Sequence, residues 1–319
     1  MNFSIAIAVF IIVLIVYIHI CFHHKMSNNL DVYEMDDIVT KDKFEDILNT
    51  RQPVVFNFSN KLIFEFNEAL LDEYANINLN VHKCLDDDIC FTPVQTAIAS
   101  KLFKSKQLYI SERNASFLEK SKMLNNMNRC DGHLRPYGLS NSYYDLITGN
   151  SESYTTLRHE ICYRNFFIVT SGSVCVKLFP PIYKETLQHT DDYEKFMFYS
   201  KINPWDVKFP YKESFSQSKC IDISLEKGQI ISIPAYWYYS FMLKEESTFI
   251  TSFKYNTFFN ELATIQYNAL FFLQNQNTTY KFVKEKKNKK IPKKEKRENK
   301  KAENNSHSKD IIPKNDVKM

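Results

Sequence analysis

The sequence predicts a mainly β domain with flanking helices, an α+β fold, between an N-terminal membrane helix and a polar C-terminal tail. Three observations lead to this prediction. First, short stretches rich in aromatic and β-branched residues follow one another through the second half of the chain. Short strands at such spacing are typical of a sandwich or a barrel. Second, an apolar stretch near the N-terminus predicts a membrane helix. Third, the C-terminal stretch is polar and basic. We therefore expect three parts, over residues 1–24, 31–274 and 281–319.

The N-terminal part contains an apolar run from Ile5 to Phe22 that only His19 interrupts. A helix of this length spans about 27 Å, close to the hydrocarbon core of a bilayer. The alternatives are a buried core helix and a cleaved signal peptide, but the basic start and small-residue cleavage site of a signal peptide are missing here. We predict a single-pass anchor. Lys25, directly after the span, places the domain on the cytoplasmic side.

The first half of the domain alternates between two hydrophobic patterns. Apolar residues spaced three and four apart predict helices, and strict alternation predicts strands. On this basis we expect strands over 53–58, 77–83 and 107–110, and helices over 61–76 and 92–103.

The second half of the domain consists almost entirely of predicted strands. These cover residues 154–161, 166–170, 174–179, 221–225, 229–233, 236–243 and 249–255. An apolar helix over 257–274 then closes the domain.

Glycine and cysteine usage excludes several classes of site. The chain has five glycines, whereas average usage gives roughly 22 for this length. They are too scattered for a Rossmann loop, a P-loop or a hydrolase nucleophile elbow. The seven cysteines contain no C-x-x-C pair, which favours free thiols in a reducing compartment over a zinc site or a disulfide framework.

The net charge of +4 is unevenly distributed along the chain. Residues 281–319 contain 15 Lys/Arg and 6 Asp/Glu, a balance of +9, so the other 280 residues carry 4 − 9 = −5. A stretch with so few apolar residues buries too little surface to fold, and we predict a disordered tail over Lys281–Met319. Its candidate partners are anionic lipid or nucleic acid. The alternative is a solvated tail that binds neither.

Two motifs resemble the jumonji-C/cupin-like family. The first starts at Thr156 and reads TLRHEICYRNFFIVTSGSVCVKLFPP, and the second starts at Gly228 and reads GQIISIPAYWYYS. Counted from His159, the first has Asn, Gly and Pro-Pro at the offsets found in the asparaginyl hydroxylase of hypoxia-inducible factor, at Asn165, Gly172, Pro180 and Pro181. The resemblance implies a double-stranded β-helix, the jelly-roll of the cupins, flanked by helices.

The same resemblance implies a site for Fe(II) and 2-oxoglutarate, in which two histidines and a carboxylate hold the metal. His159 matches the first ligand, but Ile161 occupies the carboxylate position and Tyr239 that of the distal histidine. Thr156 and Asn165 match polar contacts to the co-substrate. Because two of three ligands are replaced, we predict vestigial metal positions at His159, Ile161 and Tyr239, vestigial cofactor contacts at Thr156 and Asn165, and no bound metal or cofactor.

Strand alternation places residues 159 and 161 on one face, so Glu160 is predicted to point away from the site. Two alternatives would restore a metal site: a bulge that turns Glu160 inward, or ligation by the His189-Thr-Asp191 stretch. Either would give an Fe(II)/2-oxoglutarate-dependent protein hydroxylase with a rearranged site. We predict instead a membrane-anchored pseudoenzyme, a binding or structural module with an unidentified protein partner. The Asn, Lys and Ile bias fits a viral protein from a large DNA virus.

Overall fold

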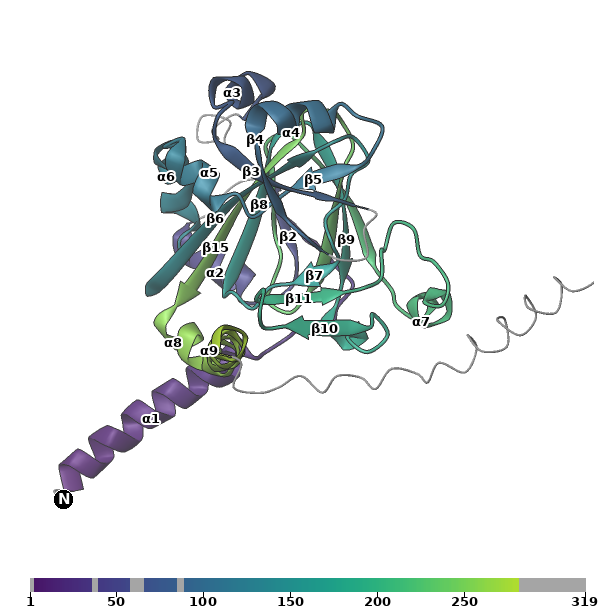
Figure 1. The fold of residues 1–319 in the computed structure, drawn as a ribbon. Helices are drawn as coiled ribbons and strands as arrows, with labels where there is room; N and C mark the ends of the chain where they lie inside the picture. The colour runs from purple at the N-terminus through teal and green to yellow at the C-terminus, as the bar shows by residue number, and fades with distance from the viewer. Residues whose placement is uncertain (1–2, 36–39, 58–65, 85–88, 281–319) are drawn as a thin grey trace, which may run out of the picture. The chain divides into compact units, whose positions relative to one another are not determined.

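Two β-sheets with helices on one side form the core of the structure, a computed structural model of the chain (Figure 1). It describes residues 3–35, 40–57, 66–84 and 89–280. The predicted tail over 281–319 and the first part of the predicted helix over 61–76 lie outside the described residues. The chain divides after Asn275 into two units, and the sheets lie in the first.

The larger sheet has nine strands among the described residues. Every strand pair in it is antiparallel except β1–β2. Its strands, in spatial order, are β1 (Tyr33–Met35), β2 (Val54–Asn57), β13 (Gln229–Ser232), β8 (Arg164–Ser171), β15 (Phe249–Thr257), β6 (Leu139–Gly149), β5 (Tyr109–Ser111), β3 (Asn78–Lys83) and β4 (Thr92–Gln95).

The smaller sheet has six antiparallel strands in the same part of the chain. Their spatial order is β10 (His189–Asp192), β11 (Met197–Ser200), β7 (Arg158–His159), β14 (Tyr238–Leu243), β9 (Ser173–Phe179) and β12 (Ile221–Glu226). The 3₁₀ turn η1 (Pro181–Tyr183) and the short helix α7 (Lys212–Ser216) lie in its connections.

The facing sides of the two sheets enclose one apolar core. The larger sheet contributes Phe167 and Ile231, and the smaller contributes Tyr239 and Phe241, all 1% exposed or less. Because alternate residues of a strand point to opposite faces, the neighbouring Tyr238 lies outside this core. This alternation on β14 fixes which side chains reach the space between the sheets.

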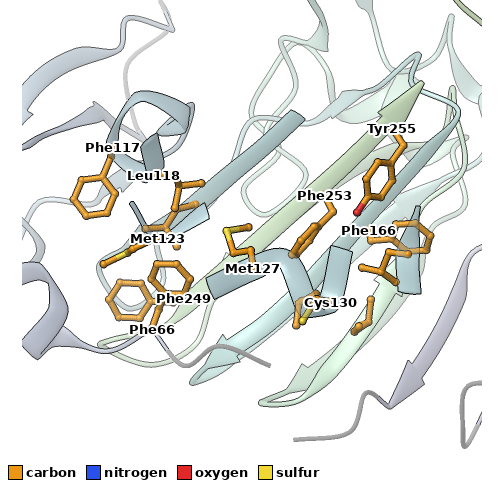
Figure 2. Packing of buried hydrophobic residues seen from close by; sticks show 14 of the residues in the cluster. Phe66, Phe117, Leu118, Met123, Met127, Cys130, Phe166, Phe249, Phe253 and Tyr255 are labelled. Atoms are coloured by element: carbon orange, nitrogen blue, oxygen red, sulfur yellow. The ribbon is translucent and has the colours of Figure 1, made fainter. Parts of the chain in front are cut away.

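Helices cover the outer face of the larger sheet. In Figure 2, Met127 and Cys130 face the apolar side chains of β15, among them Phe253. Burying this face removes a large apolar surface from water, which stabilises the sandwich. The helices are α2 (Lys41–Leu48), α3 (Glu68–Glu73), α4 (Thr96–Phe103), α5 (Ala115–Lys120) and α6 (Leu124–Leu134).

The main predictions of the fold are confirmed, and three local ones are wrong. The sheets, the flanking helices and the apolar N-terminal helix are present, and all seven cysteines are free. The predicted helix over 92–103 is helical only from Thr96, since 92–95 forms strand β4. The predicted strand over 154–161 is reduced to the two residues of β7. The predicted helix over 257–274 is two helices that meet at Thr264.

Three helices lie near the chain ends: α1 (Phe3–His23), α8 (Phe258–Ala263) and α9 (Ile265–Tyr280). Among the described residues, α1 alone is long and apolar enough to cross a membrane, with a mean hydropathy of 3.1. A signal sequence has the same length and composition. The Thr257 side chain accepts a hydrogen bond from the Asn260 amide at 3.3 Å and caps the start of α8.

Candidate functional site

Strand β7 divides the site into two faces. Arg158 of β7 pairs with Tyr239 of β14. Residues that pair across two strands share a face, so Arg158 lies with Tyr239 between the sheets. His159 must then face the opposite side, where Tyr238 also points.

The inner face carries a connected set of charged side chains, which we call the inner cluster: Glu112, Arg158, Glu160, Tyr239 and Lys254. Arg158 Nη1 lies 2.5 Å from Glu112 Oε2, and Arg158 Nε donates to the Tyr239 hydroxyl at 3.2 Å. The Tyr239 hydroxyl donates in turn to Glu160 Oε1 at 2.9 Å, and Lys254 Nζ donates to the same oxygen at 2.6 Å. Two carboxylates thus neutralise two cations around one phenol.

The pKa shifts of this cluster favour its charged forms. Burial on its own raises the pKa of Glu112, but the Arg158 guanidinium, with a smaller effect from His82, lowers it to about 2. Burial likewise raises the pKa of Glu160, and Lys254 and Arg158 bring it down to about 2. The pKa of Lys254, which burial lowers, is raised overall by Glu160. Each charge is therefore held by its partners at neutral pH.

The outer face of β7 carries four rings and one aliphatic side chain, which we call the outer cluster: His159, Ile161, His189, Phe198 and Tyr238. The His159 ring stacks on His189 and Phe198, with centroid distances of 5.1 and 5.4 Å, and meets the edge of Tyr238 at 5.0 Å. Ile161 packs with Phe198 in the same apolar cluster. A stack of this kind stabilises uncharged rings.

Burial keeps the outer cluster uncharged. It lowers the pKa of His159 to about 3, and the nearby His189 adds to this shift. Neither the His159 Nδ1 atom nor the Tyr238 hydroxyl has a hydrogen-bond partner in the described structure. Glu160 only partly offsets the effect of burial on the pKa of His159, whereas in the inner cluster the partner charges outweigh burial.

This arrangement corrects the predicted orientation of Glu160. Residues 159 and 161 do share one face, as the alternation predicts, but that face is the outer one. The prediction that Glu160 points away from the site holds only relative to His159, because its carboxylate faces the interior and accepts a hydrogen bond from the Tyr239 hydroxyl. The His189-Thr-Asp191 stretch, considered as an alternative ligand pair, forms β10 and places His189 against His159.

The two predicted co-substrate positions differ in their contacts. Asn165 is buried, and its Nδ2 donates to the carbonyls of Cys162 at 3.3 Å and Ile233 at 3.2 Å, which joins the start of β8 to the end of β13. Its Oδ1 atom has no partner in the part of the chain that the structure describes. Thr156 precedes β7 and is half-buried. Their role as vestigial cofactor contacts stays a prediction.

A cavity of about 280 Å³ lies beside the inner cluster. Its charged lining residues are Arg113, Asp145, Arg158, Glu160, Lys254 and Glu261. These are three cations and three carboxylates, so their formal charges cancel. A dianion such as 2-oxoglutarate would have to displace an internal carboxylate from Arg158 or Lys254 before either cation could bind it.

The donor set does not fit the iron centre that the resemblance implies. The three positions projected for iron divide between the faces of β7, with His159 and Ile161 outside and Tyr239 inside. The inner donors, Glu160 and Tyr239, share their space with Arg158 and Lys254. Two cations that are hydrogen-bonded to these donors would repel a divalent metal ion bound at the same place.

The comparison with known families agrees with this fold. A sequence profile of the cupin-like domain family matches residues 94–264, more than half of the chain. The chain belongs to the cupin-like domain family. No curated protein matches the chain.

The sequence of this cupin-like domain does not predict most of the inner cluster. Glu112 directly follows the short strand β5, and nothing in the sequence indicates its ion pair with Arg158. Lys254 does leave a signal, because it is the single charged residue in the apolar strand FITSFKYNT. A lone cation in a buried strand predicts a buried carboxylate partner, here Glu160.

Proposed function

We propose that this protein is a membrane-anchored cupin-like module that has lost Fe(II)/2-oxoglutarate catalysis and works by binding or by scaffolding. The single observation that supports the proposal is the inner cluster. The projected distal histidine position is there Tyr239, whose hydroxyl is bonded to one member of each of two ion pairs.

The inner cluster also gives the site a structural role that does not depend on a cofactor. Arg158 links β7 to Glu112, which follows β5, and Lys254 of β15 reaches Glu160 just after β7. These pairs join the smaller sheet to the larger one from inside. A buried charge that loses its partner costs about 3–5 kcal/mol, so the native fold is expected to retain both pairs.

Binding of metal and co-substrate tests the loss of catalysis. We would titrate the full-length protein in detergent, without oxygen, with Fe(II) or Mn(II) in the presence and absence of 2-oxoglutarate. A ligand that binds only the folded state raises the unfolding temperature. We expect no rise. A rise of several degrees that disappears in Glu160→Gln contradicts the proposal, and a matched Glu119→Gln variant on exposed α5 is the control.

The alternative is a protein hydroxylase with a rearranged metal site, and one observation favours it. The Glu160 carboxylate does face the interior, where a metal ligand would have to lie. Arg158 and Lys254 oppose it, because both are bonded within the same cluster. The same titration separates the two functions, since only the hydroxylase predicts stabilisation by Fe(II) that depends on Glu160.

We also propose that α1 anchors the protein as a single-pass span with the domain in the cytoplasm. The length and hydropathy of α1 support the anchor, and Lys25 after the span supports the orientation. Extraction of membranes with alkaline carbonate should leave the protein in the pellet. Release into the supernatant contradicts the anchor, and protection of the domain from added protease in sealed cells or vesicles reports its side.

For the tail over 281–319 we propose contact with anionic lipid, because the anchor would keep its net charge of +9 near a membrane surface. Liposome binding by the full chain should then exceed that of a chain ending at Tyr280 when the lipids are anionic, and added salt should remove the difference. Equal binding by both chains contradicts the proposal, and retention on nucleic acid instead would assign the tail to that partner.

The origin of the chain is proposed on sequence features alone. The offsets of Asn165, Gly172 and Pro180 from His159 support kinship with the asparaginyl hydroxylase of hypoxia-inducible factor. The bias to Asn, Lys and Ile supports an A+T-rich source such as a large DNA virus. An alignment of homologues that shows His159 aligned with a non-ligand position of that hydroxylase would contradict the kinship.

A further inference from the structure

The helices α8 and α9 leave apolar side chains exposed beside α1 (Figure 1). Phe258 is 69% exposed, Ile265 59% and Phe272 65%. Phe258 and Leu262 lie four residues apart on α8, and Ile265 and Phe272 lie seven apart on α9 with Leu273 next to Phe272, so each helix presents its apolar residues on one side. A water-facing helix surface normally carries charged residues instead.

Charge is nearly missing from this stretch. From Phe258 to Tyr280 the sequence has one charged residue, Glu261. Its Oε1 atom accepts hydrogen bonds from Asn141 at 2.8 Å and from Asn256 at 3.2 Å. The one acid is therefore bonded to both strands of the β6–β15 pair, and the apolar surface itself presents no charge.

The end of α1 is bonded to the domain, and α8 lies beside it. His23 Nε2 lies 3.2 Å from the Tyr236 hydroxyl and 3.4 Å from Asn260 Nδ2 of α8. Arg51 Nη2 donates to the carbonyl of Phe22 at 3.4 Å. These contacts fix the end of the apolar helix to the domain. The direction of α1 therefore determines the direction of α8.

A ring contact sets the depth of α8 along α1. The His19 and Phe259 rings stack with their centroids 4.1 Å apart. His19 lies four residues before His23, about 6 Å along the helix axis. If α1 crosses a bilayer over its apolar run, His19 and Phe259 lie where the hydrocarbon meets the headgroups.

We propose that the exposed apolar side of α8 and α9, formed by Phe258, Leu262, Ile265, Phe272 and Leu273, rests in the headgroup and upper acyl region of the same bilayer that α1 spans. This surface is a second membrane contact in the manner of an interfacial helix, and it rests on the proposed anchor. It holds the cupin-like domain in one orientation against the membrane instead of letting it turn about the end of α1.

Quenching by brominated lipid tests the proposal in the full-length chain. We would reconstitute Phe258→Trp and, separately, Phe272→Trp into phosphatidylcholine vesicles with bromine near the carbonyl end of the acyl chains. Ile98→Trp on α4 is the matched control, because Ile98 is 49% exposed and lies away from α1. The native Trp205 and Trp237 contribute the same background to every variant.

We expect the emission of Phe258→Trp and Phe272→Trp to shift to shorter wavelength and to be quenched, with Ile98→Trp unaffected. Quenching equal to that of Ile98→Trp, in protein that resists carbonate extraction, overturns the membrane contact and leaves the anchor intact. Release by carbonate overturns both. A wavelength shift without quenching assigns the surface to another protein molecule and also overturns the proposal.

Discussion

The inner and outer clusters lie one residue apart on β7, yet they bury polar groups in opposite ways. Arg158 is charged and paired with Glu112, whereas His159 is neutral and packed between rings. Partner charges lower the pKa of Glu112 to about 2, and burial, only partly offset by Glu160, lowers that of His159 to about 3. The first shift keeps the Glu112 carboxylate negatively charged at neutral pH, and the second keeps the His159 ring uncharged.

The comparison shows two ways in which a cupin-like interior accommodates buried polar groups. In a catalytic cupin the metal's own charge organises the ligands. Here Arg158 and Lys254 supply the positive charge at the inner face, and they pair with the carboxylates of Glu112 and Glu160. Three experiments test this contrast between a charged face and a neutral one.

Breaking the buried ion pair should have the largest effect. Arg158→Met removes the guanidinium and leaves the Glu112 carboxylate, which is fully buried, without its main partner. We expect the free energy of unfolding to fall by about 3–5 kcal/mol, measured by urea denaturation of the full-length protein in detergent.

The double variant Arg158→Met/Glu112→Gln is the control for this prediction. It removes both charges and should recover a large part of the lost stability. A double variant as unstable as the sum of its single variants would show that the two side chains act independently, against the proposed cluster.

The pH dependence of stability should separate the two clusters. His159 has a pKa of about 3 when folded and about 6.5 when unfolded. Below pH 6.5 the unfolded state binds a proton that the folded state does not, so stability falls as the pH falls. From pH 6.5 to 5 this amounts to about 1.6 kcal/mol. Glu112 has a pKa of about 2 in the folded protein, so the stability that it contributes is lost only as the pH falls below about 4.3.

The variant His159→Phe keeps a ring in the stack and cannot take up a proton. It should reduce the loss of thermal stability between pH 6.5 and 5, to which His189 also contributes because burial lowers its pKa, and leave the loss below pH 4.3 unchanged. The exposed His133→Phe is the matched control and should leave both unchanged. If the dependence of thermal stability on pH between 6.5 and 5 is unaltered in His159→Phe, His159 is not buried in its neutral form.

Removing a single hydroxyl should have the smallest effect, and β14 provides its own control. The Tyr239 hydroxyl bonds to Arg158 and Glu160, whereas that of its neighbour Tyr238 has no partner in the described structure. Tyr239→Phe should lower the free energy of unfolding by about 1.5 kcal/mol, as for hydrogen bonds to charged groups. Tyr238→Phe should change it by less than about 0.5 kcal/mol. Equal losses in the two variants would remove the distinction between the two faces.

Much of the fold follows from local patterns in the sequence. The strands β8, β9 and β13 lie within a residue or two of their predicted bounds, because aromatic and β-branched runs leave few other structures for a chain to adopt. Strand β6 was not predicted. Its sequence LSNSYYDLITG is partly polar, and its long pairing with β15 makes it a strand.

The site was less predictable, and residues 158–160 show why. Alternation correctly separates His159 from its two neighbours, but it does not say which set faces the interior. A shift of one residue in register exchanges the two faces completely. The pairing of Arg158 with Tyr239 decides it, and that contact joins residues 81 positions apart.

The sequence by itself determined that this chain is a cupin-like domain with an apolar N-terminal helix, because hydrophobic periodicity, glycine and proline offsets and segment length are properties of the chain alone. Only the tertiary structure decided that Glu160 faces inward, that Glu112 and Lys254 neutralise the interior, and that α8 lies against α1. Each of these depends on contacts between distant segments, and the energy of a buried charge is set by the partner that folding brings to it.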